Sequence, residues 1–303
     1  MIGLTNYRTE QVWLDVFTAW YVWIDDAYQA VFPSKRHLHR RGPTPACSDS
    51  EIITVALVID TFFHGHEALG LAFLRQYHPG LFPALPDNSW FNRRRRRLLG
   101  VMEAIRRGLA HSLIDPEDAV RVVDTAPIPL CTYMRGGRCV TATGPEYASV
   151  MVSRRARLFG MRLYLTTTTT QVVDQWMLAP AAHKDAKLTP ALFEDAENLW
   201  VLGDNAFHDP DALTWLKTQR QITLLAAPRR DSRLPRWPKT WRRWFNRIRR
   251  RIETALSVLC TVFALETPGS RSLSGLLTRT ATRLLGYTVS FLTCMYFRSL
   301  TSN

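Results

Sequence analysis

Three acidic side chains stand in the sequence where divalent-metal chemistry would need them. Asp124 directly follows the apolar run 119–123, Asp204 follows the run 199–203, and Glu253 lies at the end of a run of arginines. In α/β sheets, ligands gather at the ends of strands, and a carboxylate there costs free energy unless it is paired or coordinated. Two-metal phosphoryl transfer uses such carboxylates to hold two cations about 4 Å apart. The pattern therefore predicts a metal site for phosphodiester chemistry.

Glu253 belongs to the segment Trp241–Leu259, whose apolar residues recur at helical period. The apolar stripe is formed by Trp241, Trp244, Phe245, Ile248, Ile252, Leu256 and Leu259. The opposite side contains Arg242, Arg243, Arg247, Arg249, Arg250 and Arg251. A polyanion bound by these arginines would repel Glu253 unless a divalent cation lay between them, because hard cations bridge carboxylates to phosphates. The alternative is an ordinary ion pair between Arg249 and Glu253 on a solvated face.

The positive charge of the chain is concentrated in two short segments. The formal net charge is +13 and the sequence pI is about 10.0. The segment 229–251 has eleven Lys and Arg residues and a single acid, Asp231, and Arg93–Arg97 is an unbroken run of arginines. Local positive charge favours binding to nucleic acid, or to an anionic membrane surface. From the two segments we expect DNA contacts by Arg242, Arg243, Arg247, Arg249, Arg250, Arg251, Arg93, Arg94 and Arg97.

Three tryptophans lie among the arginines of the second segment. Aromatic rings stack on unpaired bases where guanidinium groups hold the phosphates. Trp241 and Trp244 fit the apolar stripe, which favours packing in the core. We therefore expect Trp237 to be the residue that stacks on DNA.

Two further residues are candidates for an accessory role at the metal site. His183 and Asp185 follow the third predicted strand, at 171–178. A single histidine in a loop is more often structural than catalytic, so this role is an alternative to simple packing.

The elements that must position these residues divide the chain in two. Residues 1–115 are expected to be helical, with helices at 10–32, 51–63, 68–77 and 90–112, and Ser48 with Glu51 forms a capping box. Residues 116–303 alternate strands with helices. Strands are expected at 119–124, 159–170, 171–178, 199–202 and 222–226, and helices at 189–197, 210–218, 241–259 and 273–297. This order predicts an α/β domain whose mixed sheet is flanked by helices, with a basic insert at 228–240.

Composition and missing motifs exclude several classes of protein. The five cysteines are odd in number and have no CxxC spacing, which suits a reducing cytoplasm and gives no zinc signature. The longest apolar run, Leu284–Phe297, is too short to span a bilayer, so we expect no membrane association. The sequence has no GxSxG, P-loop or GxGxxG pattern.

The motifs around the three acids resemble those of the DDE transposases of bacterial insertion sequences. The resemblance is closest to the insertion sequence 982 family, within the larger group related to insertion sequence 4. It covers residues 120–260 and rests on the segments Asp124–Cys131, Phe159–Leu165, Ala179–Asp185, Gly203-Asp204 and Arg249–Thr254. The segment Ser89–Arg95 in the helical region is also similar. The sequence departs from the pattern at Ala206-Phe207, Asn246 and Cys260, where the group commonly has Gly-Tyr, Tyr and Lys.

The resemblance implies a ribonuclease H-like core in which Asp124, Asp204 and Glu253 bind two Mg²⁺ or Mn²⁺ ions. It also implies that Arg249 contacts DNA, that the N-terminal helices bind the DNA ends, and that a homodimer or larger assembly acts on paired ends in the bacterial cytoplasm, on the nucleoid. The expected reaction is cleavage at terminal inverted repeats and transfer of the 3′-hydroxyl into target double-stranded DNA. The alternatives are a catalytically inactive DNA-binding protein and a ribonuclease H-like nuclease that cuts without joining.

Overall fold

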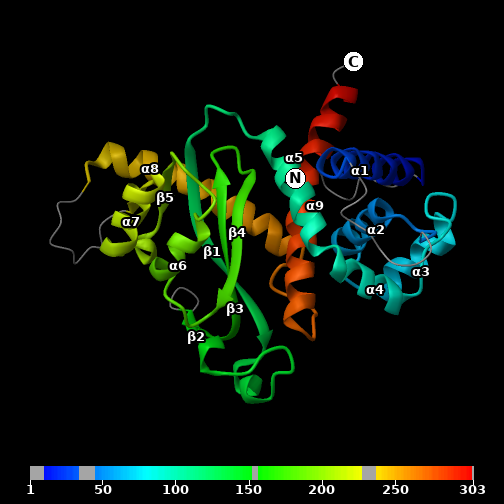
Figure 1. Cartoon of the computed structure of the whole chain (residues 1–303), viewed down its shortest axis with the longest axis horizontal. Coiled ribbons are helices and arrows are strands. Elements are labelled where there is room, and N and C mark those ends of the chain that lie inside the picture. Colours follow the sequence, from blue (N-terminus) through cyan, green and yellow to red (C-terminus); the bar gives the residue numbers. More distant parts are fainter. Residues whose placement is uncertain (1–9, 34–44, 152–155, 227–236, 302–303) are drawn as a thin grey trace. The chain divides into compact units, whose positions relative to one another are not determined.

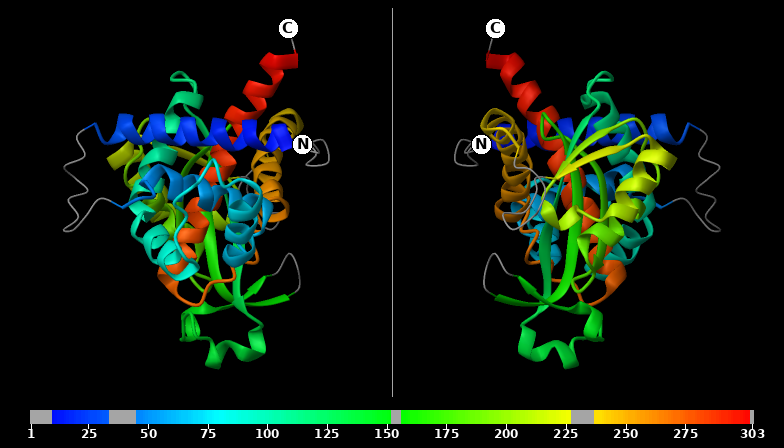
Figure 2. Two further views of the ribbon diagram at one scale, coloured as in Figure 1. Left: turned by 90° about the vertical axis from the view of Figure 1, so that its right-hand side faces the viewer. Right: turned by 90° about the vertical axis from the view of Figure 1, so that its left-hand side faces the viewer.

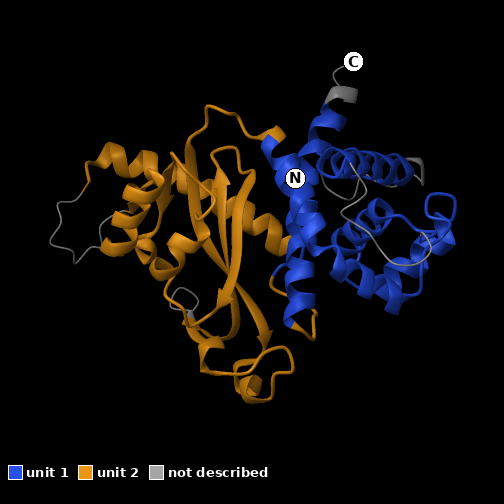
Figure 3. Cartoon of the chain, viewed as in Figure 1, with its two compact units in different colours: residues 1–111, 262–265, 273–303 blue, residues 112–261, 266–272 orange. Residues whose placement is uncertain are grey.

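The computed structural model describes residues 10–33, 45–151, 156–226 and 237–301. The chain forms two compact units, one made of residues 1–111, 262–265 and 273–303 and the other of residues 112–261 and 266–272 (Figure 3). The protein is a mixed α/β protein in which N-terminal helices precede a six-stranded mixed sheet with interspersed and C-terminal helices (Figure 1).

The first unit is helical, as the sequence predicts. Its helices are α1 (Glu10–Val31), α2 (Asp49–Phe62), α3 (Glu67–Tyr77), α4 (Asn88–Arg97), most of α5 (Leu99–Leu113) and α9 (Leu273–Thr301). The predicted capping box is confirmed, because the side chain of Ser48 accepts from the backbone N–H of Glu51 and the Glu51 carboxylate accepts from that of Ser48. The helix predicted at 90–112 is two helices, which separate at Leu98, where the backbone leaves α-helical geometry (φ −89°, ψ 7°).

Helix α9 groups with the N-terminal helices, whereas the sequence led us to place it in the second domain. Leu285 and Val289 of α9 lie in the same apolar core as α1 and α2. Trp20 donates a hydrogen bond to Thr293 at 3.0 Å. The apolar face of α9 is therefore buried by helices from the other end of the chain, which sequence order does not reveal.

The second unit is built on the sheet. Its strands are β1 (Val120–Cys131), β2 (Ala148–Met151), β3 (Ala156–Thr168), β4 (Val173–Pro180), β5 (Trp200–Gly203) and β6 (Thr223–Ala226). Strand β3 pairs antiparallel with β1, and with β2 and β4 on its other edge, while β5 is parallel to both β1 and β6. Figure 2 shows β1 and β3 as the long paired strands. Short 3-10 helices lie at Tyr133–Arg138, Pro145–Tyr147 and Asn205–Phe207.

Strand β1 is longer than predicted and continues past Asp124 to Cys131. The sequence analysis ended this strand at Asp124, where the run of β-branched residues stops; the strand also contains Pro127 and Pro129, which cannot donate to a ladder. Strand β1 pairs with β5 only at Val120–Val122, so beyond this point the prolines are tolerated on an edge that needs no donors. Asp124 therefore lies within a rigid strand and not at its end.

Helices cover the two faces of the sheet. Val123 and Tyr164 point to the face packed by α6 (Asp185–Leu192) and α7 (Pro210–Arg220), where Leu216 completes the cluster. Val122 and Leu202 point to the other face, where they meet Phe245 and Ile252 of α8 (Lys239–Thr261). Because side chains alternate along a strand, Asp124 lies on the same face as Val122, toward α8.

In the described ranges, no helix by itself is long and apolar enough to cross a membrane. Helices α2 and α3 meet the criterion only when joined, and they are bent by 111° relative to each other.

The close approach of β1 and β3 at Gly160 gives a stability test. A Cβ atom added at Gly160 would lie 2.2 Å from the backbone oxygen of Ile128, whereas one added at Gly137 meets no atom within 4 Å. We expect Gly160→Ala to lower the free energy of unfolding by about 1–3 kcal/mol, because the strands must move apart. Gly137→Ala is the matched control and should change it by less than about 0.5 kcal/mol. Equal urea midpoints for the two variants would contradict the strand register.

Candidate active site

Asp124 and Asp204 occupy equivalent positions on neighbouring parallel strands. In the β1–β5 register Val122 pairs with Leu202, and each aspartate is two residues further along its strand direction. Neighbouring strands lie about 4.8 Å apart, so the pairing brings the backbones of the two residues near each other, and the charge of Asp204 acts on the Asp124 carboxyl group. Asp204 follows the last residue of β5 in an extended conformation, and its side chain accepts from the backbone N–H of Ala206 at 2.8 Å. The sheet itself therefore brings together two acids that are far apart in sequence.

The Asp124 carboxylate is held in an unfavourable electrostatic position. Its pKa is raised from 3.8 to about 6, chiefly by burial and in smaller part by the negative charges of Asp204 and Glu253. A hydrogen bond from the Thr125 backbone N–H, at 2.8 Å, and the charge of Arg249 act in the opposite direction. The result is a desolvated carboxylate with two acidic neighbours, which is the environment in which a bound cation is favoured.

Helix α8 supplies the third acid and the nearest arginine. Ile252 is fully buried against the sheet and fixes the helix there. The next residue, Glu253, is exposed and lines an open cleft of about 360 Å³ together with Thr125–Pro127 of β1. One turn earlier, a terminal nitrogen of Arg249 lies 3.9 Å from the Asp124 carboxylate, and the buried Arg249 Nε has no hydrogen-bond partner.

The described residues show no group of three or more His, Cys, Asp or Glu side chains arranged to hold a metal ion. Arg249 is the cationic side chain that lies beside Asp124, at 3.9 Å. The donor chemistry nevertheless fits Mg²⁺ or Mn²⁺, because Asp124, Asp204 and Glu253 offer hard carboxylate oxygens. In addition, the negative charge of Asp124 is only partly compensated by its neighbours. Asp124, Asp204 and Glu253 are thus residues that could hold a divalent ion.

Most arginines of α8 are free to meet a ligand on the outer face. Arg242, Arg243, Arg247 and Arg250 are exposed. Arg251 is also exposed and donates to the backbone oxygen of Thr169. Of the basic insert predicted at 228–240, residues 228–236 lie outside the described residues.

The core packing expected for Trp241 and Trp244 is contradicted, and it is Trp237 that packs in the apolar cluster. Trp237 packs edge-on against Phe245, with ring centroids 5.1 Å apart, and belongs to the apolar cluster under α8. Trp241 is 58% exposed and Trp244 38% exposed. The helical period correctly predicts a stripe, but the sheet covers α8 only from Phe245 onward. The two indoles at the start of the helix are therefore left at the surface.

Two other predicted site residues, Arg94 and Asp185, have structural partners, and a third, His183, lies at the surface. Arg94 is buried and pairs with Asp49 at 2.7 Å, so it cannot contact DNA in this structure. Asp185 is buried on the sheet face opposite Asp124, where Arg162 and the Tyr164 hydroxyl donate to it at 2.9 and 2.7 Å. His183 is exposed in the turn before α6.

Sequence reasoning overlooked some residues that line the cleft or the basic surface. Ser257, Cys260 and Glu266 line the cleft beside Glu253. The Cys260 thiol donates to Glu266 at 3.8 Å. Helical spacing from Glu253 could have identified Ser257 and Cys260, at i+4 and i+7. Arg93 and Arg97 are exposed as predicted, and Arg96, which we did not select, is exposed beside them.

Because Asp124 is buried, we expect that replacing its carboxylate by a neutral amide will raise the free energy of unfolding, by an amount that depends on pH. Because the folded protein holds the Asp124 proton more tightly than the unfolded chain, ionisation destabilises the fold as pH rises from about 4 to above 6. The change in pKa from 3.8 to about 6 corresponds to about 3 kcal/mol. Asp124→Asn should therefore stabilise the metal-free protein by up to about 3 kcal/mol at pH 7.5 and have little effect at pH 4, as measured by urea unfolding.

The matched control is Asp209→Asn. The hydrogen bond from Lys187 lowers the pKa of Asp209, which is the opposite sign, so its neutralisation should not stabilise the fold at pH 7.5. A difference between wild type and Asp124→Asn that is the same at both pH values would contradict the burial of this charge.

Comparison of the chain with protein-family models, with curated proteins and with solved structures finds no match. The functional conclusion therefore depends on the geometry of Asp124, Asp204 and Glu253 and on the motifs of the sequence.

Proposed function

We propose that the chain is a DDE-type DNA transposase whose second unit is a ribonuclease H-like catalytic core. The sheet supports this proposal. Three antiparallel strands, β4, β3 and β1, are followed across the sheet by β5 and β6, which run parallel to β1. Ribonuclease H-like cores combine antiparallel and parallel strands in this way. Helices α6 and α7 connect the later strands on one face, and α8 packs on the other.

The observation that carries the proposal is the placement of the three acids relative to one face of the sheet. Asp124 and Asp204 share one level of two parallel strands, and α8 presents Glu253 at a cleft lined by the residues that follow Asp124. The charges of Asp204 and Glu253 both act on the Asp124 carboxyl group, since each raises its pKa. A set of carboxylates on separate rigid elements is what phosphoryl transfer with divalent ions requires.

Asp124, Asp204 and Glu253 would hold the divalent ions. When bound, such ions activate the attacking oxygen and stabilise the leaving oxygen of a phosphodiester. The burial of Asp124 favours ion binding, because a cation would offset both its desolvation and the repulsion from the other two acids.

The arginines of α8 would bind the DNA that enters this site. Arg242, Arg243, Arg247 and Arg250 lie exposed along the helix that contributes Glu253. Guanidinium groups bind phosphates in a bidentate manner, so they would fix the strand beside the carboxylates. Arg249 has an unused buried donor at Nε and lies next to Asp124, which suits it to contact the phosphate nearest the site.

The proposed reaction has two displacements at phosphorus. In the first, a water oxygen bonds to a phosphorus at the end of the element, the bond to the 3′-oxygen breaks, and a 3′-hydroxyl and a 5′-phosphate result. In the second, this 3′-oxygen bonds to a phosphorus of the target DNA and displaces the target 3′-oxygen. Both are in-line displacements and need no covalent bond between protein and DNA.

A second candidate is a DNA-binding protein without catalysis. It is favoured by one specific observation, the pairing of Arg249 with Asp124 in a chain whose described residues contain no assembled metal-binding group. In such a protein the arginine would replace the metal as the permanent counter-ion, and the basic surface of α8 would remain.

Plasmid cleavage distinguishes the two candidates. We expect the protein to cut supercoiled plasmid DNA that carries the gene with its flanking sequences, in Mg²⁺ or Mn²⁺ and not in EDTA. Asp124→Ala and Glu253→Gln should each reduce cleavage by at least about 1,000-fold, because the acids act as a unit. Asp211→Ala removes an exposed carboxylate from α7 and should cut like the wild type.

Products identify the reaction class. Joined molecules that contain target DNA support transposition, whereas metal-dependent cuts without joining would indicate a nuclease. DNA binding without cleavage in any divalent metal would leave the non-catalytic candidate.

A further inference from the structure

Two cysteines of the second unit lie at the two ends of one short loop. Cys131 is the last residue of β1, and Cys139 directly follows the 3-10 helix Tyr133–Arg138. Both are free thiols in the structure. Their side chains are hydrogen-bonded to each other. The loop 132–138 therefore brings two sulfur atoms of the same chain into contact.

The loop returns to β1 because it packs on strand β3. Phe159 of β3 is the cross-strand partner of Cys131. Gly136, in the middle of the loop, lies against the Phe159 ring, since a Cβ atom added at Gly136 would come within 2.4 Å of that ring. The backbone N–H of Cys139 then donates to the carbonyl oxygen of Gly136 at 3.1 Å. One aromatic side chain thus helps to position both ends of the loop.

The other three cysteines have different surroundings. Cys47 and Cys294 belong to the first unit, and Cys260 of α8 donates to Glu266. Within the pair, Cys139 is 7% exposed, whereas Cys131 is half-buried. A reagent in solution therefore reaches Cys131 more readily than Cys139.

The surroundings of Cys131 also set the conditions under which it reacts. Burial and, after it, the hydrogen bond with Cys139 raise the pKa of the Cys131 thiol, while the charge of Arg135 lowers it. The thiol is therefore mainly protonated at neutral pH. Only the thiolate attacks a disulfide, so the reaction of Cys131 should be faster in mildly alkaline solution.

We propose that Cys131 and Cys139 form a reversible disulfide when the chain meets a glutathione-type disulfide as oxidant. A disulfide bond is about 2.05 Å long, so two hydrogen-bonded sulfur atoms need only a small shift to form one. Reversible disulfides of this kind are the ones found in reducing compartments, where they act in redox sensing. The proposal does not depend on the DNA chemistry proposed above.

The exchange has two steps. The Cys131 thiolate attacks one sulfur of the oxidant, whose S–S bond breaks and releases one thiolate. The Cys139 thiolate then attacks the Cys131 sulfur and displaces the second half of the oxidant as another thiolate. The two cysteine protons pass to the two released thiolates. One disulfide is thus reduced as another forms.

The new bond would restrain a loop that is attached to one wall of the candidate cleft. Thr141, two residues after Cys139, donates to the carbonyl oxygen of Ser270 at 3.1 Å. Ser270 belongs to the segment 266–272, and Glu266 of this segment lines the cleft. A cross-link between Cys131 and Cys139 removes conformations from the loop between them. Oxidation would therefore limit the movement of the chain next to that wall.

Peptide mapping of the full-length chain tests the proposal. Trypsin cleaves after Arg135 and Arg138, so it separates Cys131 from Cys139. The protein is incubated with oxidised glutathione at about pH 8, and its free thiols are then blocked with iodoacetamide. We expect peptides 122–135 and 139–154 to be joined by a disulfide and to separate in dithiothreitol. The chain should lose two of its five thiols.

Three variants identify the bond. Cys139→Ser should keep glutathione on Cys131, whereas in the wild type this adduct should be at least about tenfold less abundant, because Cys139 displaces it within the same chain. Cys131→Ser should give no cross-link, and its Cys139 should be alkylated by iodoacetamide. Cys294→Ser, the matched control in the first unit, should form the cross-link at the rate of the wild type.

Two results for the wild type would overturn the proposal. The first is a folded chain that keeps glutathione on Cys131, and the second is a chain in which both cysteines remain alkylated by iodoacetamide. Both are read from the unaltered protein, so a variant that failed to fold would not affect the conclusion.

Discussion

The unfavourable burial of the Asp124 carboxylate is the constraint on which the candidate site depends. Strand β1 holds the Asp124 carboxylate between the sheet and α8, where it is only partly solvated. The two acids that act on it, Asp204 and Glu253, carry the same negative charge and therefore repel it. A desolvated carboxylate among other carboxylates is stable only if a cation is available. The nearest cationic side chain is Arg249, at a separation of 3.9 Å that is long for an ion pair. Arg249 therefore offsets the Asp124 charge only in part, and such a partly compensated carboxylate favours a bound cation.

Helix α8 carries both the residues next to Asp124 and the exposed arginines of this unit. Phe245, Ile252 and Leu259 fix the helix on the sheet by apolar burial, and this packing determines where the intervening polar residues point. Arg249 and Glu253 are one turn apart on the side toward β1, while Arg242, Arg243, Arg247 and Arg250 are exposed to solvent. One amphipathic helix therefore places an acid at the site and phosphate-binding groups outside it.

The sequence was sufficient to predict most of the helices and strands in their order, and the elements that bear or precede the three acids, because hydrophobic period is a local signal. It was insufficient where the outcome depended on a distant partner. Trp241 and Trp244 have the spacing of buried residues, but the sheet does not extend under that end of α8. Asp124 lies within β1 and not at its end, because an edge position tolerates Pro127 and Pro129. Strand β2, which pairs only at Ala148–Met151, is too short to give a periodic signal.

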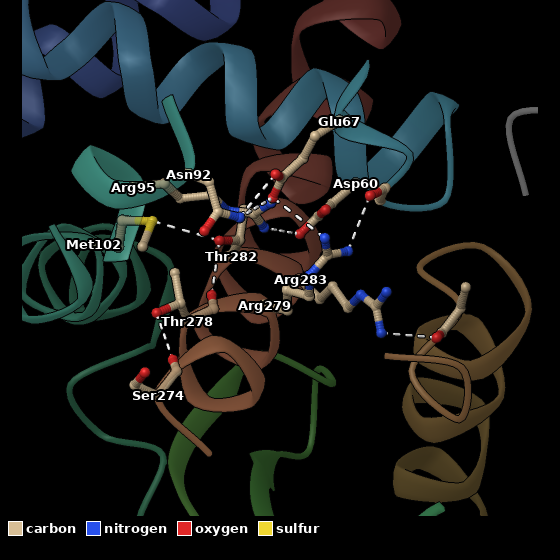
Figure 4. Close-up of polar contacts among 12 residues, drawn as sticks. Asp60, Glu67, Asn92, Arg95, Met102, Ser274, Thr278, Arg279, Thr282 and Arg283 are labelled. Atoms are coloured by element: carbon tan, nitrogen blue, oxygen red, sulfur yellow. Dashed lines mark hydrogen bonds and ion pairs between the residues drawn. The ribbon is translucent and has the colours of Figure 1, made fainter. Parts of the chain in front are cut away.

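The arginines of α4 show why net charge overstates a binding surface. A chain of charge +13 invites the expectation that each cluster of arginines meets a polyanion. In α4 two of the five guanidinium groups are instead buried, where they pair with Asp49, Asp60 and Glu67. Figure 4 shows the two pairs of Arg95. These acids belong to α2 and α3, and nothing in the sequence of those helices indicates that they pair with the arginines of α4. Removing an internal arginine would leave these acids buried and unpaired, so its effect on DNA binding would follow from loss of structure. Only substitutions of arginines outside such networks can measure a contribution to ligand binding. The structure is needed to tell these exposed arginines from the buried ones.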